Sequence, residues 1–125
     1  MDETQAINRV RLATLTAAWA AGDAEAAAAC FAPEGVYAAS VGPQPGATFY
    51  GRREIRDGIA TMLALDLGAP RVIDEPLFLN DRAITTWTYW KGAGDGLHAV
   101  RGCDLFTFSR GRILMKDAFR KTQVG

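Results

Sequence analysis

Residues 102–121 read GCDLFTFSRGRILMKDAFRK and predict two adjacent β-strands joined by a tight turn. Apolar and polar residues alternate from Phe106 to Ser109, which is the period of a strand with one buried face. Arg110 and Gly111 separate the two halves, and a short connection that contains Gly is typical of a hairpin. We therefore expect strands at Leu97–Ser109 and at Arg112–Lys121.

The rest of the chain predicts helices and further strands around this hairpin. Apolar spacing of three and four residues, with Gly, Asp or Pro at the ends, places helices at 3–21, 24–31 and 52–67. Further strands are expected at 34–41, 71–79 and 83–91, with a Gly- and Pro-rich loop at 42–51. Helices first and consecutive strands last predict an α+β protein whose helices cover one face of an antiparallel sheet.

The composition predicts one ordinary globular domain that spans residues 1–125. Hydrophobic residues make up 49% and charged residues 22% of the 125 residues, which is typical of a folded protein. Lys and Arg total 14, as do Asp and Glu, so the chain has no net charge to attract a polyanion. We expect no nucleic-acid partner.

Cellular location and cofactors are also constrained by the sequence. The N-terminal MDETQAINRV has no basic stretch followed by an apolar run, and no segment approaches the roughly 20 apolar residues of a membrane span. We therefore expect a cytoplasmic protein without membrane contact. Cys30 and Cys103 lack a metal-binding spacing, so we expect neither a metal nor an organic cofactor.

One carboxylate interrupts the apolar pattern of the hairpin. Alternation from His98 to Ser109 places Asp104 on the same face as Phe106 and Phe108. Aromatic neighbours remove water from a carboxylate, which disfavours its charged form and would make Asp104 a proton donor. A structural Asp104 that accepts hydrogen bonds from backbone or Arg groups is the alternative.

Asp117 presents a similar anomaly in the last strand. Alternation places it on one face with Ile113, Met115 and Phe119, so it becomes a second candidate for a catalytic acid. The phase stays open, because a single β-bulge would invert it. An ion pair with a neighbouring Lys or Arg is an equal alternative.

Several large side chains are candidates to line a pocket. Most are amphipathic rings, and each taken singly fits an ordinary core or dimer contact as well. The set comprises Trp19, Tyr37, Trp87, Tyr89, Trp90, His98, Phe106 and Phe108. For His98, at the start of its strand, a solvated position is the alternative. Together the rings favour a small apolar or aromatic molecule as the ligand.

Three motifs, taken in order, resemble the nuclear transport factor 2-like superfamily, and in particular its SnoaL-like branch and the ketosteroid isomerases. They are AAWAAGDAEAAAACFAPEGVY, FYGRREIRDGI and the hairpin GCDLFTFSRGRILMKDAFRK. The resemblance spans nearly the whole chain. It implies a cystatin-like cone, in which a curved, mainly antiparallel sheet wraps around N-terminal helices, with a central pocket and commonly a homodimer across the sheet.

The same resemblance implies roles for individual residues. Asp104 falls where ketosteroid isomerases place the protonated aspartate of their oxyanion hole and where SnoaL-like cyclases have an acid/base aspartate. The isomerase general base and oxyanion tyrosine are replaced by Ala39 and Leu15, so steroid isomerisation is not expected. Asp117 lies near an aspartate of the limonene epoxide hydrolases, whose other polar site residues are apolar or aromatic in this chain.

Residues and resemblance together predict a cofactor-independent cyclase, isomerase or dehydratase. Asp104 would act as general acid/base on an apolar substrate that is cyclic or bears a carbonyl group. A non-catalytic module that binds a hydrophobic ligand or dimerises, and an epoxide hydrolase-like enzyme that uses Asp117, are the alternatives. We expect a homodimer through the sheet face that carries Cys103, Leu105 and Thr107.

Overall fold

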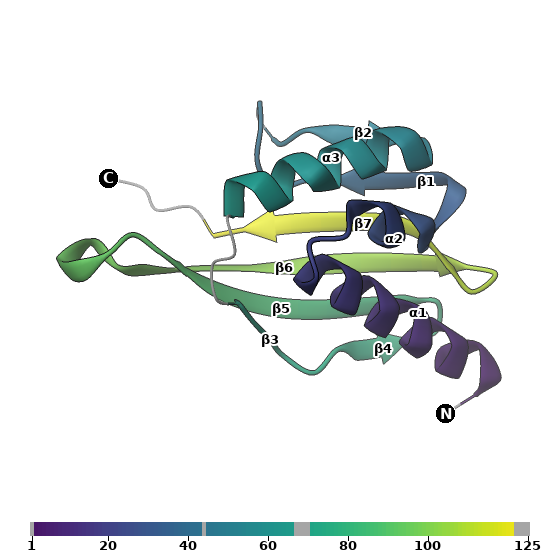
Figure 1. Cartoon of the computed structure of the whole chain (residues 1–125). Helices are drawn as coiled ribbons and strands as arrows, with labels where there is room; N and C mark the ends of the chain where they lie inside the picture. Colours follow the sequence, from purple (N-terminus) through teal and green to yellow (C-terminus); the bar gives the residue numbers. More distant parts are fainter. Residues whose placement is uncertain (1, 44, 67–70, 122–125) are drawn as a thin grey trace.

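The computed structural model describes residues 2–43, 45–66 and 71–121, and within them three α-helices pack on one face of a curved sheet (Figure 1). The helices are α1 (Glu3–Ala20), α2 (Ala24–Ala29) and α3 (Gly51–Asp66). The strands are β1 (Phe31–Ala38), β2 (Thr48–Tyr50), β3 (Arg71–Ile73), β4 (Leu77–Leu79), β5 (Arg82–Lys91), β6 (His98–Ser109) and β7 (Arg112–Arg120). The expected α+β class is confirmed.

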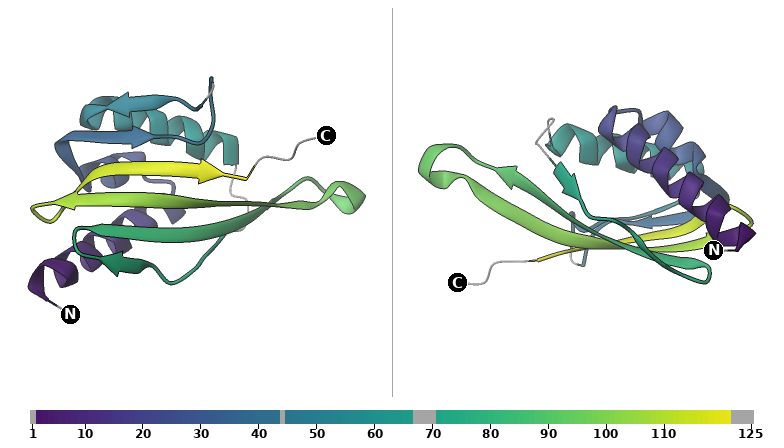
Figure 2. Two further views of the ribbon diagram at one scale, coloured as in Figure 1. Left: turned by 180° about the vertical axis from the view of Figure 1, so that it is seen from behind. Right: turned by 90° about the horizontal axis from the view of Figure 1, so that it is seen from below.

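The strands form one mixed, unclosed sheet in the order β2-β1-β7-β6-β5-β3, with β4 also paired to β5. The described pairings are antiparallel except that β1 runs parallel to β7. β5 and β6 form the long central hairpin. The right-hand view of Figure 2 shows that this hairpin curves toward the side on which the helices lie. We call that side the concave face and the opposite side the outer face.

Local capping sets the ends of the first two helices. The side chain of Asp2 accepts a hydrogen bond from the backbone of Gln5 at 2.7 Å, and that of Asp23 accepts one from the backbone of Ala26 at 3.0 Å. The second helix ends earlier than the sequence predicts. Phe31 belongs to β1 instead, because strand pairing with β7 outweighs the helix propensity of the alanine run.

Two other predicted boundaries are wrong. The single strand expected at 71–79 is divided into β3 and β4, and Pro76, which has no backbone N–H to donate, lies in the break. The loop expected at 42–51 contains the short strand β2, which pairs with β1. The third helix matches its prediction within one residue at its start, and its expected last residue, Leu67, lies outside the described residues.

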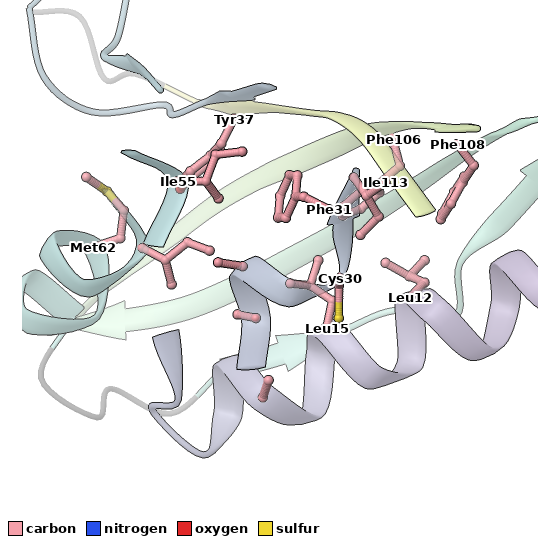
Figure 3. Packing of buried hydrophobic residues seen from close by; sticks show 14 of the residues in the cluster. Leu12, Leu15, Cys30, Phe31, Tyr37, Ile55, Met62, Phe106, Phe108 and Ile113 are labelled. Atoms are coloured by element: carbon pink, nitrogen blue, oxygen red, sulfur yellow. The ribbon is translucent and has the colours of Figure 1, made fainter. Parts of the chain in front are cut away.

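The hydrophobic core lies between the helices and the concave face. Figure 3 shows Leu12 and Leu15 of α1 pointing toward Phe106, Phe108 and Ile113 of the sheet. Burial of these side chains supplies the main stabilisation of the fold. It also holds the C-terminal end of α1, with Trp19, against the strands that carry the candidate site.

The outer face of the sheet carries apolar side chains that the described residues leave exposed. Trp90, Leu105 and Phe119 are 38%, 41% and 49% exposed.

None of the helices within 2–43, 45–66 and 71–121 is both long and apolar enough to cross a membrane.

Gly102 provides a test of the central packing. A methyl group on Gly102 would collide with the backbone oxygen of Phe119 and with the Trp87 ring. We expect Gly102→Ala to lower the free energy of unfolding by about 1–3 kcal/mol, because neither neighbour can retreat without disturbing the sheet. Thermal and urea unfolding measure this. Gly96→Ala, at a position where added atoms meet open space, is the control, and equal stabilities of the two variants would contradict the packing described.

Candidate functional site

The concave face holds a buried ion pair between Asp104 on β6 and Lys116 on β7. Lys116 Nζ lies 3.4 Å from Asp104 Oδ2, and the two side chains are 7% and 12% exposed in that order. Among the ion pairs that the described residues form, this one is the most buried. Because each buried charge loses its hydration, the residues around such a pair must compensate for that loss.

Lys116 reaches the concave face because β7 contains a β-bulge. The pairing of β6 with β7 shifts between Thr107 and Phe108, and Leu114 is the extra residue on β7. Strict alternation from the buried Ile113 would instead point Lys116 to the outer face. The bulge therefore creates the ion pair.

The same bulge turns Asp117 away from the site. Asp117 lies directly opposite the half-exposed Leu105, and directly opposed residues share a face of the sheet. The expectation that Asp117 shares the face of Ile113 and points into a pocket is wrong. The epoxide hydrolase-like alternative loses the residue on which it depended.

Aromatic rings surround the Lys116 ammonium group. Nζ lies 4.7 Å from the ring centroids of both Trp19 and Tyr37, which meet edge to face. The Phe106 ring is a third neighbour, at 6.0 Å. Ring faces attract cations, so these contacts offset part of the hydration that Lys116 loses.

Burial shifts the proton affinities of this cluster. It lowers the pKa of Lys116 from its usual value, and the negative charge of Asp104 opposes the shift without reversing it. The neutral form of the Lys116 amine is therefore more populated at neutral pH than that of a solvated lysine. Burial raises the pKa of Tyr37, and the Asp104 charge adds to the shift, so the phenol stays protonated.

Two buried polar atoms beside the pair have no hydrogen-bond partner among the described protein groups. They are Asp104 Oδ1, an acceptor, and Trp19 Nε1, a donor. An unpaired buried polar atom destabilises a protein by about 1–3 kcal/mol. Both atoms are thus suited to bind a polar group of a ligand.

Two small cavities adjoin the pair, and a third, larger cavity shares Trp19 and Arg71 with both of them. The outer cavity has a volume of about 440 Å³ and is lined by Thr16, Trp19, Ala20, Leu63, Asp66, Arg71 and Ile73. Two inner cavities of about 40 and 30 Å³ reach Asp104 and Lys116. Each inner cavity has room for one small polar group, since a water molecule takes about 30 Å³ in the liquid.

Two arginines lie over the stacked rings of Trp87 and Tyr89. Arg71 is paired with Asp66 at 2.7 Å. Arg120 donates to the Tyr89 hydroxyl and has no acidic partner among the described residues.

Cations outnumber anions around the cavities. The charged residues there are Arg71, Lys116 and Arg120 against Asp66 and Asp104. The site therefore has an excess of positive charge, which favours an anion or a developing oxyanion.

The described part of the chain offers little for a metal or a thiol reaction. Its His, Cys, Asp and Glu side chains form no group of three that could hold a metal ion. Cys30 is buried in the core and Cys103 is half-buried, and burial raises the pKa of both thiols. Neither cysteine is therefore activated as a nucleophile.

The structure brings together part of the set predicted from the sequence. The residues of that set that line the inner cavities are Trp19, Tyr37, Trp87, Asp104 and Phe106, and Tyr89 packs beside them. Phe108 lies in the core. Trp90 points to the outer face, because it follows the inward Tyr89, and His98 is exposed with Nδ1 2.9 Å from the carbonyl oxygen of Gly96. The expectation that Trp90 and His98 line the pocket is wrong, whereas the solvated position considered for His98 is confirmed.

Sequence reasoning missed the cations of the site. Lys116 and Arg120 share the face of β7 opposite to Asp117. The sequence left undecided which of the two faces of this strand points inward, and the other choice would have predicted both cations. Arg71 begins a three-residue strand that pairs with β5, opposite Tyr89. The sequence predicts a strand that begins at this residue, but not the pairing with β5 that places Arg71 beside the site.

Comparisons with known proteins agree with this architecture. The sequence matches the SnoaL-like domain family over residues 12–115. The fold is similar to that of an NTF2-like protein of unknown function from Mesorhizobium loti, with 24% identity, coverage of 98% of this chain and 97% of that chain, and a TM-score of 0.80. No curated protein matches the sequence.

Two further solved structures with similar folds hold small molecules. One is a hypothetical protein with a ketosteroid isomerase-like fold from Catenulispora acidiphila in complex with trimethylamine, with 23% identity, coverage of 87% and 83% of the two chains, and a TM-score of 0.70. The other is TerC co-crystallised with polyporic acid, with 16% identity, coverage of 92% of each chain and a TM-score of 0.74. These likenesses show the fold, and the expected cone is confirmed.

A double-mutant cycle tests the buried ion pair. Asp104→Asn leaves a buried ammonium unpaired and Lys116→Met leaves a buried carboxylate unpaired, so each change should reduce stability by about 3 kcal/mol. The double variant buries no charge at either position and should lose roughly 2 kcal/mol less than the sum of the two. Urea unfolding at neutral pH measures all four proteins.

The control for this cycle is the exposed pair Glu25–Arg56, whose side chains are 79% and 44% exposed. Its coupling between Glu25→Gln and Arg56→Met should stay close to zero, because solvent screens the two charges. Additive effects of the changes at Asp104 and Lys116 would show that the two side chains do not interact as described.

Proposed function

This chain belongs to the SnoaL-like domain family, and we propose that it is a cofactor-independent enzyme of cyclase, isomerase or dehydratase type. Asp104, which keeps one buried oxygen unpaired beside a cavity, would be its general acid/base. The unpaired Oδ1 is the observation that carries the proposal. Most buried polar atoms have a hydrogen-bond partner, so an unpaired oxygen beside a cavity supports a role in binding or proton transfer.

The geometry around Asp104 supports proton transfer. Lys116 holds Oδ2, which leaves Oδ1 available to take a proton from a carbon next to a carbonyl group. Loss of that proton places negative charge on the carbonyl oxygen. The indole N–H of Trp19 and the positive charge of Lys116 are the groups suited to stabilise this oxyanion, and Asp104 can then return the proton to another atom of the substrate.

The walls of the site favour a planar, cyclic, oxygen-bearing substrate. The rings of Trp19, Tyr37 and Trp87 supply flat apolar surfaces, and the excess positive charge favours a carbonyl or enolate oxygen. The outer cavity, at about 440 Å³, lies within the range usual for small-molecule sites. The trimethylamine and polyporic acid complexes of proteins with similar folds add support for a small-molecule ligand.

A non-catalytic binding module is the second candidate. It is favoured by the small inner cavities, which admit only one polar group to Asp104 and Lys116. In that case Asp104 would orient a bound ligand without exchanging a proton with it.

Hydrogen exchange into 2-tetralone separates the two candidates. This probe is cyclic and apolar, and it carries acidic hydrogens next to its carbonyl group. We expect the wild-type protein to accelerate exchange of these hydrogens in deuterated water, measured by NMR. Asp104→Asn should reduce the acceleration roughly a hundredfold or more, because the amide cannot take the proton.

The controls distinguish chemistry from folding and binding. Asp117→Asn changes a carboxylate on the outer face and should leave the rate unchanged. Quenching of tryptophan fluorescence by 2-tetralone reports binding, and circular dichroism reports folding of each variant. Binding by the wild-type protein without accelerated exchange would favour the binding module and refute the enzyme.

We also propose a homodimer through the outer face of the sheet. Leu105 is opposed by Ile84 on β5, and Phe119 by Cys103 on β6, so exposed and half-buried apolar side chains adjoin across three strands. An apolar patch of this kind on a sheet face is typical of a protein interface. A second copy of the chain fits it because identical apolar patches complement each other about a two-fold axis.

Light scattering tests the dimer. We expect the wild-type protein to show twice the 13.5 kDa of one chain at micromolar concentration. Leu105→Glu should shift the protein to the monomer, because it places a second carboxylate directly opposite Asp117 in the patch. Leu65→Glu, at an exposed apolar position on α3, is the matched control and should leave the mass unchanged. A wild-type monomer would refute the proposal.

A further inference from the structure

We infer that Lys116 is a nucleophile that forms an imine with the carbonyl group of the substrate, with Asp104 as its proton partner. The inference rests on the proposed function, because the cavities must admit a carbonyl compound. It assigns to Lys116 a covalent role beyond that of holding Asp104 in place.

The position of Lys116 supports attack on a carbonyl group. Lys116 lines both inner cavities together with Asp104, so a group that enters either one meets the amine and the carboxyl group at once. The Trp19 and Tyr37 rings hold the ammonium end of the side chain in place. An oriented nucleophile with an adjacent acid/base group is the arrangement that covalent catalysis requires.

The fold retains a buried lysine where an apolar residue would be the simpler choice. Lys116 is 6% exposed and projects into an aromatic cluster, and a buried ion pair seldom stabilises a protein more than well-packed apolar residues do. Lys91 and Lys121, the other lysines of the sequence, are half-buried and exposed. Only Lys116 therefore combines an amine with a cavity and a carboxyl partner.

The two side chains can supply and recover every proton of the reaction. Transfer of a proton from Lys116 to Asp104, across 3.4 Å, gives a neutral amine and a carboxylic acid. The amine nitrogen attacks the carbonyl carbon while Asp104 protonates the carbonyl oxygen, which gives a carbinolamine whose nitrogen returns a proton to Asp104. Asp104 then protonates the hydroxyl group, which leaves as water, and a protonated imine remains beside the Asp104 carboxylate. The net change is the loss of one water.

The electrostatics of the site agree with this sequence. The lowered pKa of Lys116 increases the fraction of neutral amine at neutral pH. The protonated imine keeps the positive charge at the same place, among the same rings and beside the same carboxylate. The imine also makes the adjacent C–H more acidic, which assists the proton transfer proposed for Asp104.

Reductive trapping with benzaldehyde tests the imine. Benzaldehyde has no hydrogen on a carbon next to its carbonyl group, so trapping does not depend on the proton transfer of the proposed function. The full-length wild-type protein is incubated with benzaldehyde and sodium cyanoborohydride, and peptide mass spectrometry follows each lysine over time. We expect Lys116 to be alkylated roughly tenfold faster than Lys91 and Lys121, because its amine is more often neutral and is positioned by its neighbours.

The three lysines are compared within one chain, so the result does not require a variant to fold. An excess of 2-tetralone should slow alkylation of Lys116 and leave Lys91 and Lys121 unaffected. Alkylation of Lys116 at or below the rate of the other two lysines would overturn the inference.

Lys116→Arg keeps the charge but cannot form the imine, and it separates this inference from the proposed function. Loss of 2-tetralone exchange in this folded variant supports the imine. Full exchange in Lys116→Arg would overturn the imine and leave Asp104 as the acid/base group. Trapping at Lys116 without any Asp104-dependent exchange would support the imine and refute the proposed acid/base role.

Discussion

The β-bulge at Leu114 sets which side chains of β7 reach the interior, and the rest of the site depends on it. In a regular strand the buried Ile113 would place Asp117 inside and Lys116 outside. The extra residue reverses this order beyond the bulge. Asp104, which reaches the concave face from β6, consequently meets a cation and not a second carboxylate. Two facing carboxylates would repel each other, whereas the observed pair attracts.

The ion pair in turn constrains its surroundings. Both charges lose hydration, so the protein must compensate for it with the mutual attraction of the pair and with ring faces directed at the ammonium group. The compensation is incomplete on the acid, because one oxygen of Asp104 has no protein donor. A ligand that supplies a donor to this oxygen would complete the network. The same residues thus account for the unfavourable free energy of burying these charges and for the suitability of the region as a binding site.

Curvature and helix packing give this polar centre its access to the outside. The helices rest on the concave face through a core of Leu, Ile and Phe side chains (Figure 3). Near the end of α1, Trp19 packs against Tyr37 of β1. The outer cavity lies where α1, α3 and β3 approach one another, and its walls continue into the inner cavities through Trp19 and Arg71. A large cavity with apolar and charged walls, which shares Trp19 and Arg71 with the small cavities at Asp104 and Lys116, favours a cyclic body with one reactive oxygen.

The class of fold, the order of the helices and long strands, and the inward position of Asp104 could all be predicted from the sequence. Strict alternation in β6 and the helical spacing of α1 and α3 are local properties of the chain, so they can be recognised without the fold. The partners of Asp104, in contrast, could not be predicted without the fold. The phase of β7 depends on a bulge, the early end of α2 on pairing with β7, and the contribution of Arg71 on the pairing of β3 with β5. Each of these depends on contacts between residues far apart in the chain, whose free energy outweighs local preference and leaves no periodic trace in the sequence.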